Sequence, residues 1–245
     1  MGLTKKELQA SILERKQNSL LNNFKLTKLN GSIYFEDTTN SFYTDNIYLI
    51  MKSRYGITTV GIVSFKRSYT DLEIEINKIL SNADYIPDQA YTIDKGYGKE
   101  YEGKSEYDIK DVADLNYVVS KFYEVIETKY SSFFEESALF KNIYNRVISI
   151  PVKDYNDHNK VNLRTYDLHV LFIKYIGDDL TYFEQANEFK SRYHEQIILN
   201  GGYNTIADSY RLELMRSIKN IDELLLRIDG GDYKELKEKY AVLLT

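Results

Sequence analysis

The chain has 245 residues, 43% hydrophobic and 28% charged, with a formal net charge of −5 at pH 7. This composition is typical of a folded protein, and the length allows one large domain or two small ones. The absence of cysteine excludes disulfides, a thiol nucleophile and cysteine-ligated metals. The acidic balance makes nucleic acid an unlikely main partner. No apolar run is long enough for a membrane span, and the N-terminus lacks a signal-peptide pattern, so we expect a cytoplasmic protein.

The first part of the chain is predicted to contain antiparallel strands flanked by helices. Thr4 with Glu7, and Thr70 with Glu73, both have the spacing of a capping box, which predicts a helix at each place. We expect the first helix to run to about Leu21. Runs rich in β-branched and aromatic residues predict three strands, the last two joined through a turn at 54–56 as a hairpin. These strands are expected at 32–36, 46–52 and 57–65.

A long helix is predicted between Asp111 and Phe134, because apolar residues recur there every three or four positions. The chain after it is predicted to be mostly helical. A buried strand at 169–176 is the one rival, since periodicity does not separate helix from strand in a short apolar run. Asn220 is expected to cap a separate short helix. The helices are expected near 139–150, 163–176, 181–199, 205–218, 224–228 and 232–243.

These elements predict an α+β fold: N-terminal antiparallel strands with flanking helices, followed by a predominantly helical C-terminal half. A polar connection at 154–159 suggests a soft boundary. We therefore expect an α+β domain at 1–150, ending in the long central helix, and a helical domain or subdomain at 151–245. A single domain is the alternative.

Residues 94–108 combine three glycines with many charges and show no period, so they are predicted to form an exposed loop. Within them, Gly98 to Ser105 matches the phosphate-loop pattern of glycine, four residues, then Gly103-Lys104-Ser105. In such a loop bare amides wrap the phosphates, the lysine meets the terminal phosphates and the hydroxyl holds magnesium. The pattern would imply ATP or GTP with Mg²⁺. Its context is poor, because only a short strand precedes it and Glu100 and Glu102 would lie among the phosphates.

Other patterns for chemistry are weaker still. Pro87-Asp88 followed by Glu102-Gly103-Lys104 resembles the carboxylate and lysine pattern of metal-dependent nucleases, but glycine and charge surround it instead of an apolar strand. The three histidines, His158, His169 and His194, do not have metal-ligand spacing. His169 lies in an apolar run and is interpreted as a core histidine with a partner. We therefore assign no catalytic residue, metal or cofactor.

The leading hypothesis is a non-enzymatic protein that binds another protein. Tyrosine is abundant, at 23 residues, and supplies rigid contact area at interfaces. The binding surface is expected to include the 94–108 loop with Tyr97, Tyr101 and Tyr107 exposed. Frequent lysine, asparagine and isoleucine are typical of an AT-rich bacterial or phage genome, and the chain is similar in type to toxin-immunity and phage-defence accessory proteins. The alternatives are a nucleotide- or metal-dependent enzyme using the same loop, and a structural component of a larger assembly.

Overall fold

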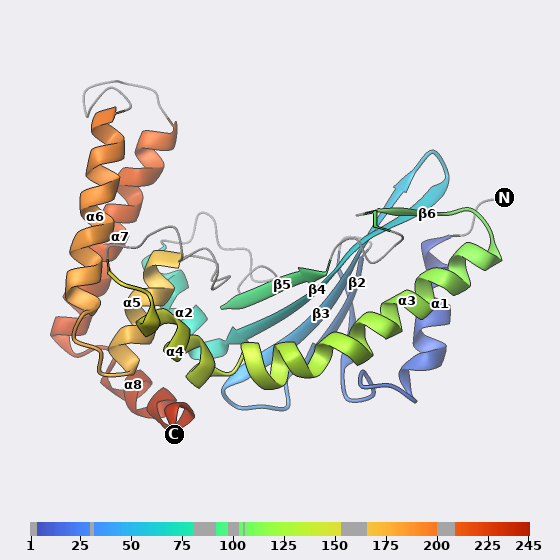
Figure 1. Ribbon diagram of the computed structural model, residues 1–245, viewed down its shortest axis with the longest axis horizontal. Coiled ribbons are helices and arrows are strands. Elements are labelled where there is room, and N and C mark those ends of the chain that lie inside the picture. The colour runs from blue at the N-terminus through green and yellow to red at the C-terminus, as the bar shows by residue number, and fades with distance from the viewer. Residues whose placement is uncertain are drawn as a thin grey trace. The chain divides into compact units, whose positions relative to one another are not determined.

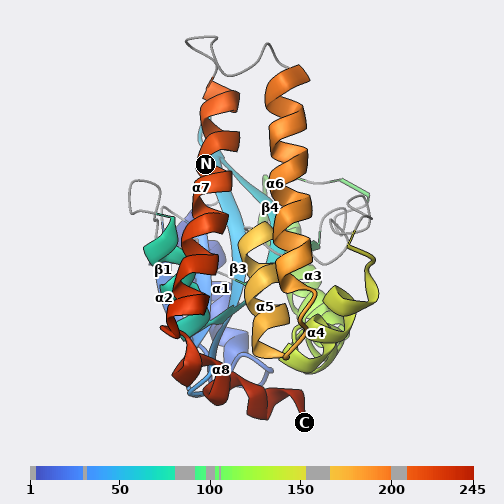
Figure 2. The ribbon, with the colours of Figure 1, turned by 90° about the vertical axis from the view of Figure 1, so that its left-hand side faces the viewer.

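A computed structural model describes residues 4–29, 32–80, 92–97, 103–104, 106–152, 166–199 and 209–245 (Figures 1 and 2). Within these residues the predicted fold class is confirmed: an antiparallel sheet with helices comes first, and the C-terminal half is mostly helical. The chain packs into two compact units, one made of 1–68 with 93–139 and the other of 69–92 with 140–245. The domain division expected at residue 150 stays a prediction.

The sheet of the first unit has the order β1-β2-β3-β4-β5, and the short β6 also pairs with β4. β3 and β4 are the two long strands, and a two-residue turn of Tyr55 and Gly56 joins them. Both turn residues have positive φ, 51° and 78°, as a hairpin of this twist requires. The strands are β1 Lys25–Leu29, β2 Ser32–Asp37, β3 Tyr43–Arg54, β4 Ile57–Tyr69, β5 Ile93–Tyr97 and β6 Tyr107–Ile109.

The structure confirms the three predicted strands and the hairpin, and it adds β1, β5 and β6, of which the sequence indicated only a possible short strand at 90–93, before most of β5. Two of them, β5 and β6, lie inside or at the edge of the stretch expected to be an exposed loop, so that expectation is wrong for 94–97 and 107–108. Both pair antiparallel with β4. They are short and flanked by charge and glycine, and only a few of their side chains, such as Ile93 and Ile109, face the core. These strands are held by backbone hydrogen bonds to β4. Such pairing produces little periodicity in the sequence, so the sequence did not predict them beyond that short strand.

Helices α1, Lys5–Lys16, and α3, Val112–Tyr130, lie along one face of this sheet (Figure 1). The capping box at Thr4 is confirmed, because Thr4 Oγ1 accepts from the Glu7 amide and Glu7 accepts from the Thr4 amide at 2.6 Å. The helix is shorter than expected and ends before Leu21. The predicted apolar face of α3 is buried, with Phe122 packed on Phe35 of β2. After Tyr130 the helix widens into the π-helical segment Ser131–Ser137.

The second unit is helical in its described residues. The predicted helix at 163–176 is confirmed as α5, and the rival strand is wrong. α6 and α7 form an antiparallel pair (Figure 2). Asn220 is buried inside the continuous α7 and does not begin a separate helix, so that prediction is wrong. The helices are α2 Thr70–Ile79, α4 Phe140–Ser149, α5 Tyr166–Ile176, α6 Tyr182–Leu199, α7 Ser209–Gly230 and α8 Lys234–Ala241, followed by a 3₁₀ turn at Val242–Leu244.

Glu73 has a different role from the one its spacing predicted. α2 begins after Tyr69 without a side-chain cap, so the predicted capping box at Thr70 is wrong. Glu73 is buried, and its Oε1 accepts from Thr92 Oγ1 at 2.6 Å and lies 2.7 Å from His169 Nε2. A carboxylate buried in this way needs such partners, because desolvation without them is costly. The interpretation of His169 as a core histidine with a partner is confirmed.

A buried ion pair joins the two long strands of the first unit. Arg67 of β4 donates from Nε to Asp45 Oδ1 at 2.6 Å and from Nη2 to Oδ2 at 2.7 Å, so the pair is bidentate. Arg67 Nη1 also donates to the carbonyl of Ala138, just after the π-helical segment. The Tyr43 ring lies with its centroid 3.7 Å from the guanidinium carbon. One side chain therefore links β3, β4 and the end of the helical layer.

We expect Arg67→Leu to lower the free energy of unfolding by about 3–5 kcal/mol, because it leaves the Asp45 carboxylate buried without its cation. The double variant Asp45→Asn with Arg67→Leu buries no charge and should recover part of that loss. Urea denaturation followed by circular dichroism measures both. A loss below about 1 kcal/mol for the single variant would contradict the burial of the pair, because that is the range of exposed pairs.

Candidate functional site

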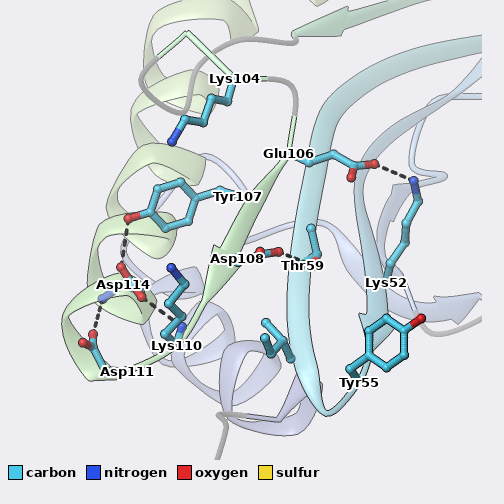
Figure 3. Close-up of a pocket in the computed structure, with 11 residues that line it drawn as sticks. Lys52, Tyr55, Thr59, Lys104, Glu106, Tyr107, Asp108, Lys110, Asp111 and Asp114 are labelled. Carbon is cyan, nitrogen blue, oxygen red and sulfur yellow. Dashed lines mark hydrogen bonds and ion pairs between the residues drawn. The ribbon is translucent and has the colours of Figure 1, made fainter.

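The first candidate site is a pocket of about 690 Å³ in the first unit. It lies where the tip of the β3–β4 hairpin, strand β6 and the start of α3 meet (Figure 3). Two residues singled out from the sequence, Lys104 and Tyr107, line it. We call it the hairpin pocket, and its lining residues are Lys52, Tyr55, Ile57, Thr59, Lys104, Glu106, Tyr107, Asp108, Lys110, Asp111 and Asp114.

The carboxylates of the hairpin pocket are engaged within the fold (Figure 3). Thr59 Oγ1 donates to Asp108 Oδ1 at 2.6 Å, which ties β4 to β6 beside their backbone pairing. Lys52 and Glu106 form an exposed ion pair at 2.6 Å. These carboxylates therefore have partners before any ligand arrives.

Asp114 organises the end of the pocket nearest α3. Its Oδ1 accepts from the Tyr107 hydroxyl at 2.8 Å and its Oδ2 from the Lys110 amide at 2.9 Å. Its own amide donates to Asp111, the N-cap of α3. The Lys110 amide first, and then the Tyr107 hydroxyl, hold the pKa of Asp114 below its usual value. Tyr107 is thereby fixed in the pocket wall.

The lysines of the pocket have fewer interactions within the fold than its carboxylates. Lys104 and Lys110 are exposed, and among the described residues no carboxylate lies within ion-pair distance of either ammonium group. In the view of Figure 3 the Tyr107 ring lies between these two side chains. The pocket thus presents the Tyr107 ring and the two lysine ammonium groups, while its carboxylates already accept hydrogen bonds within the fold.

The other residues predicted for binding are placed differently. Tyr97 is only 7% exposed, and its ring packs edge-on against Phe65 with centroids 5.0 Å apart, so the expectation that it is exposed is wrong. β5 pairing turns its ring into the sheet's core, which its glycine-rich surroundings in sequence did not indicate. Tyr101, Gly98 and Ser105 lie outside the described residues. Their binding roles stay predictions.

The geometry around Lys104 differs from that of a phosphate loop. Such a loop runs from a strand into a helix, whose first amides hold the phosphates. Here Gly103 is in a turn with φ of 78°, and the chain beyond Lys104 enters the antiparallel strand β6. The next helix, α3, begins at Val112. This arrangement lends no support to the nucleotide hypothesis, which stays a prediction to be tested.

The nuclease-like pattern falls on Pro87, Asp88 and Glu102, which lie outside the described residues. Within the part of the chain that the structure describes, no three histidine, aspartate or glutamate side chains are grouped closely enough to hold a metal ion. None of the described helices is long and apolar enough to cross a membrane.

A second pocket of about 460 Å³ lies in the same unit and was missed by the sequence reading. We call it the Tyr130 pocket. The Arg67–Asp45 pair forms part of its wall, and the π-helical segment contributes Phe134 and Glu135. The signal in the sequence was weak, because Asp45 and Arg67 lie in strands that carry other charged residues as well. Its lining residues are Asp37, Thr39, Asn40, Tyr43, Asp45, Arg67, Tyr130, Phe134, Glu135 and Leu139.

Comparison with known proteins does not assign either pocket. The chain matches no protein-family model, no curated protein and no solved structure. The functional argument therefore depends on the geometry of the described residues.

Lowering the pH should remove the contribution of Asp114 to stability. Because its folded pKa is depressed, this contribution is present above its unfolded pKa of about 3.9 and is lost as the pH falls through the folded value. We expect Asp114→Asn to lower the melting temperature at pH 7, since a carboxylate accepts stronger hydrogen bonds than an amide. In calorimetry the difference from the wild type should be smaller at pH 3 than at pH 7, because pH 3 lies below the unfolded pKa. An equal difference at both pH values would contradict this role.

A thermal-shift assay tests the nucleotide alternative directly. A ligand at about 100 times its dissociation constant adds roughly 2.7 kcal/mol and raises the melting temperature by several degrees. From the path of the chain after Lys104 we expect no shift with ATP or GTP and Mg²⁺. A shift that Lys104→Ala abolishes would instead establish a phosphate site here.

Proposed function

We propose that the protein acts without catalysis by binding another protein, and that the partner contacts the rim of the hairpin pocket. The observation that carries this proposal is the placement of Tyr55. Its side chain is 103% exposed, at the tip of the β3–β4 hairpin, with φ of 51°. A large aromatic side chain is thus fully exposed to solvent in a two-residue turn.

Both features of Tyr55 work against stability. Positive φ is uncommon outside glycine, asparagine and aspartate, and in a bulky residue it marks strain of about 1 kcal/mol or more. Asparagine before Gly56 would suit this turn better. Exposing the ring also forgoes the stabilisation that its burial would give. A strained, exposed tyrosine is therefore best explained by what it contacts, and tyrosine is among the residues most enriched at binding hot spots.

The surroundings of Tyr55 suit a protein partner. Ile57, at 36% exposure, adds apolar surface next to the turn. Lys104 and Lys110 supply cations at the rim of the hairpin pocket, while Asp114 holds Tyr107 in place. A partner segment with an apolar patch for the Tyr55 ring and carboxylates for the lysines would complement this surface. This is the usual anatomy of an interface, with an aromatic anchor and a polar rim.

The finer proposal concerns the kind of protein. We infer a cytosolic protein of a bacterium or phage that acts by occupying a partner, as immunity and defence-accessory proteins do. The resemblance is only in general character. Three features support the proposal: the acidic composition, the abundant tyrosine and the exposed side chain of Tyr55. The partner's identity is left to experiment.

The substitution Tyr55→Asn separates binding from folding. It removes the ring and places Asn-Gly in the turn, so the melting temperature should stay the same or rise slightly. Partners are first captured from the native cell with the wild-type protein and identified. Calorimetry with the purified partner should then show at least a tenfold weaker affinity for Tyr55→Asn, which is the effect of a hot-spot residue.

Leu180→Asn is the matched control, because Leu180 is 82% exposed in a turn of the second unit and also becomes asparagine. It should leave the affinity unchanged. A partner that binds Tyr55→Asn as tightly as the wild type would refute the placement of the interface at the hairpin tip.

A further inference from the structure

We propose that the Tyr130 pocket binds an organic cation, the ammonium or guanidinium group of a lysine or arginine side chain. This site is separate from the surface around Tyr55, and the inference does not depend on that surface. It rests on three features of the pocket: its aromatic walls, its excess of carboxylates and the cation that one wall already holds.

The walls of the pocket are aromatic. Tyr43 comes from the start of β3, Tyr130 from the last residue of α3 and Phe134 from the π-helical segment. The rings of Tyr130 and Phe134 lie with centroids 5.0 Å apart at 51°. Aromatic faces attract cations through their quadrupole, most strongly where water is excluded. Segments of π-helix are frequent at functional sites, and this one supplies two of the lining residues.

The charges of the pocket leave an excess of anion. Asp37, Asp45 and Glu135 line it together with a single basic residue, Arg67. Asp45 receives both guanidinium bonds. Asp37 Oδ1 accepts from the Thr39 amide at 2.9 Å and from the Thr39 hydroxyl at 2.7 Å. The negative charges of Asp37 and Glu135 have no basic partner within ion-pair distance among the described residues.

These charges affect the pKa of the Tyr130 phenol. Burial first, and then the carboxylates of Asp45 and Asp37, raise its pKa to about 12; Glu135 acts in the same direction, and the Arg67 guanidinium acts against it. Three carboxylates from different elements thus act electrostatically on one point of the pocket wall. A cation entering the pocket would be favoured by the same field.

The wall already holds one cation of this chemistry. The Arg67 guanidinium lies 3.7 Å from the Tyr43 ring centroid while both its donors to Asp45 remain satisfied. In this pocket an aromatic face and a carboxylate therefore already bind one guanidinium group together. Tyr130, Asp37 and Glu135 line the same pocket, and no described basic residue lies within ion-pair distance of either carboxylate. The carboxylates are not grouped as metal ligands within the described residues, which favours an organic cation.

The test is a titration followed by ¹⁵N spectra of the whole chain with N-acetyl-lysine N-methylamide and its arginine counterpart. Amides of residues 37–45 and 130–139 should shift saturably. We expect millimolar affinity, as for a ligand of about a dozen non-hydrogen atoms. High salt should weaken it, because screening shortens the reach of the carboxylates. The neutral acetyl-norleucine N-methylamide, of similar length, should not bind.

Glu135→Gln removes one exposed carboxylate and should weaken binding by about threefold to fivefold, the effect of a partly exposed ion pair. The control is Glu127→Gln, an exposed glutamate of α3 that does not line the pocket, which should leave affinity unchanged. Absent shifts, equal binding of the norleucine compound or equal weakening by the control variant would overturn the proposal. Spermidine serves as a second probe: if it alone binds, the pocket takes free polyamines and the assignment to a side chain is wrong.

Discussion

The first unit depends on the buried pair of Arg67 and Asp45. Charges at this depth are costly to desolvate, and only the bidentate contact, the Ala138 carbonyl and the Tyr43 ring together make the position tolerable. These partners come from β3, β4 and the end of the helical layer, so the pair forms only when all three are in place. Burial nevertheless raises the pKa of Asp45 above its usual value, so part of the desolvation cost remains.

The same long hairpin carries both candidate sites, one at each end. At the turn it presents Tyr55 beside the hairpin pocket. At the open end the start of β3 and the end of β4 place Asp45 and Arg67 in the wall of the Tyr130 pocket. A rigid pair of strands is a precise support for binding groups, because sheet pairing fixes where each side chain points.

The two pockets differ in which charged groups remain without a partner of opposite charge. In the hairpin pocket Asp108 and Asp114 are hydrogen-bonded within the fold, and the lysines are left exposed. In the Tyr130 pocket the one basic residue pairs with Asp45, and the carboxylates of Asp37, which accepts from Thr39, and Glu135 have no basic partner among the described residues. A partner protein with acidic and basic side chains could be recognised through this contrast, because complementary charge sets specificity more than affinity. The two proposals are nevertheless independent, since each has its own residues and readout.

The sequence by itself determined the fold class, the hairpin, the amphipathic α3 and the cap at Thr4, because these follow from local periodicity and short-range hydrogen bonds. Tertiary structure decided the rest. Glu73 has the spacing of a cap but is buried with His169, a residue remote in sequence. Tyr97 and Tyr107 both lie in one charged stretch, yet pairing with β4 buries the first and leaves the second lining a pocket. The Tyr130 pocket escaped sequence reading because its parts come from β2, β3, β4 and the end of α3, and only packing brings them together.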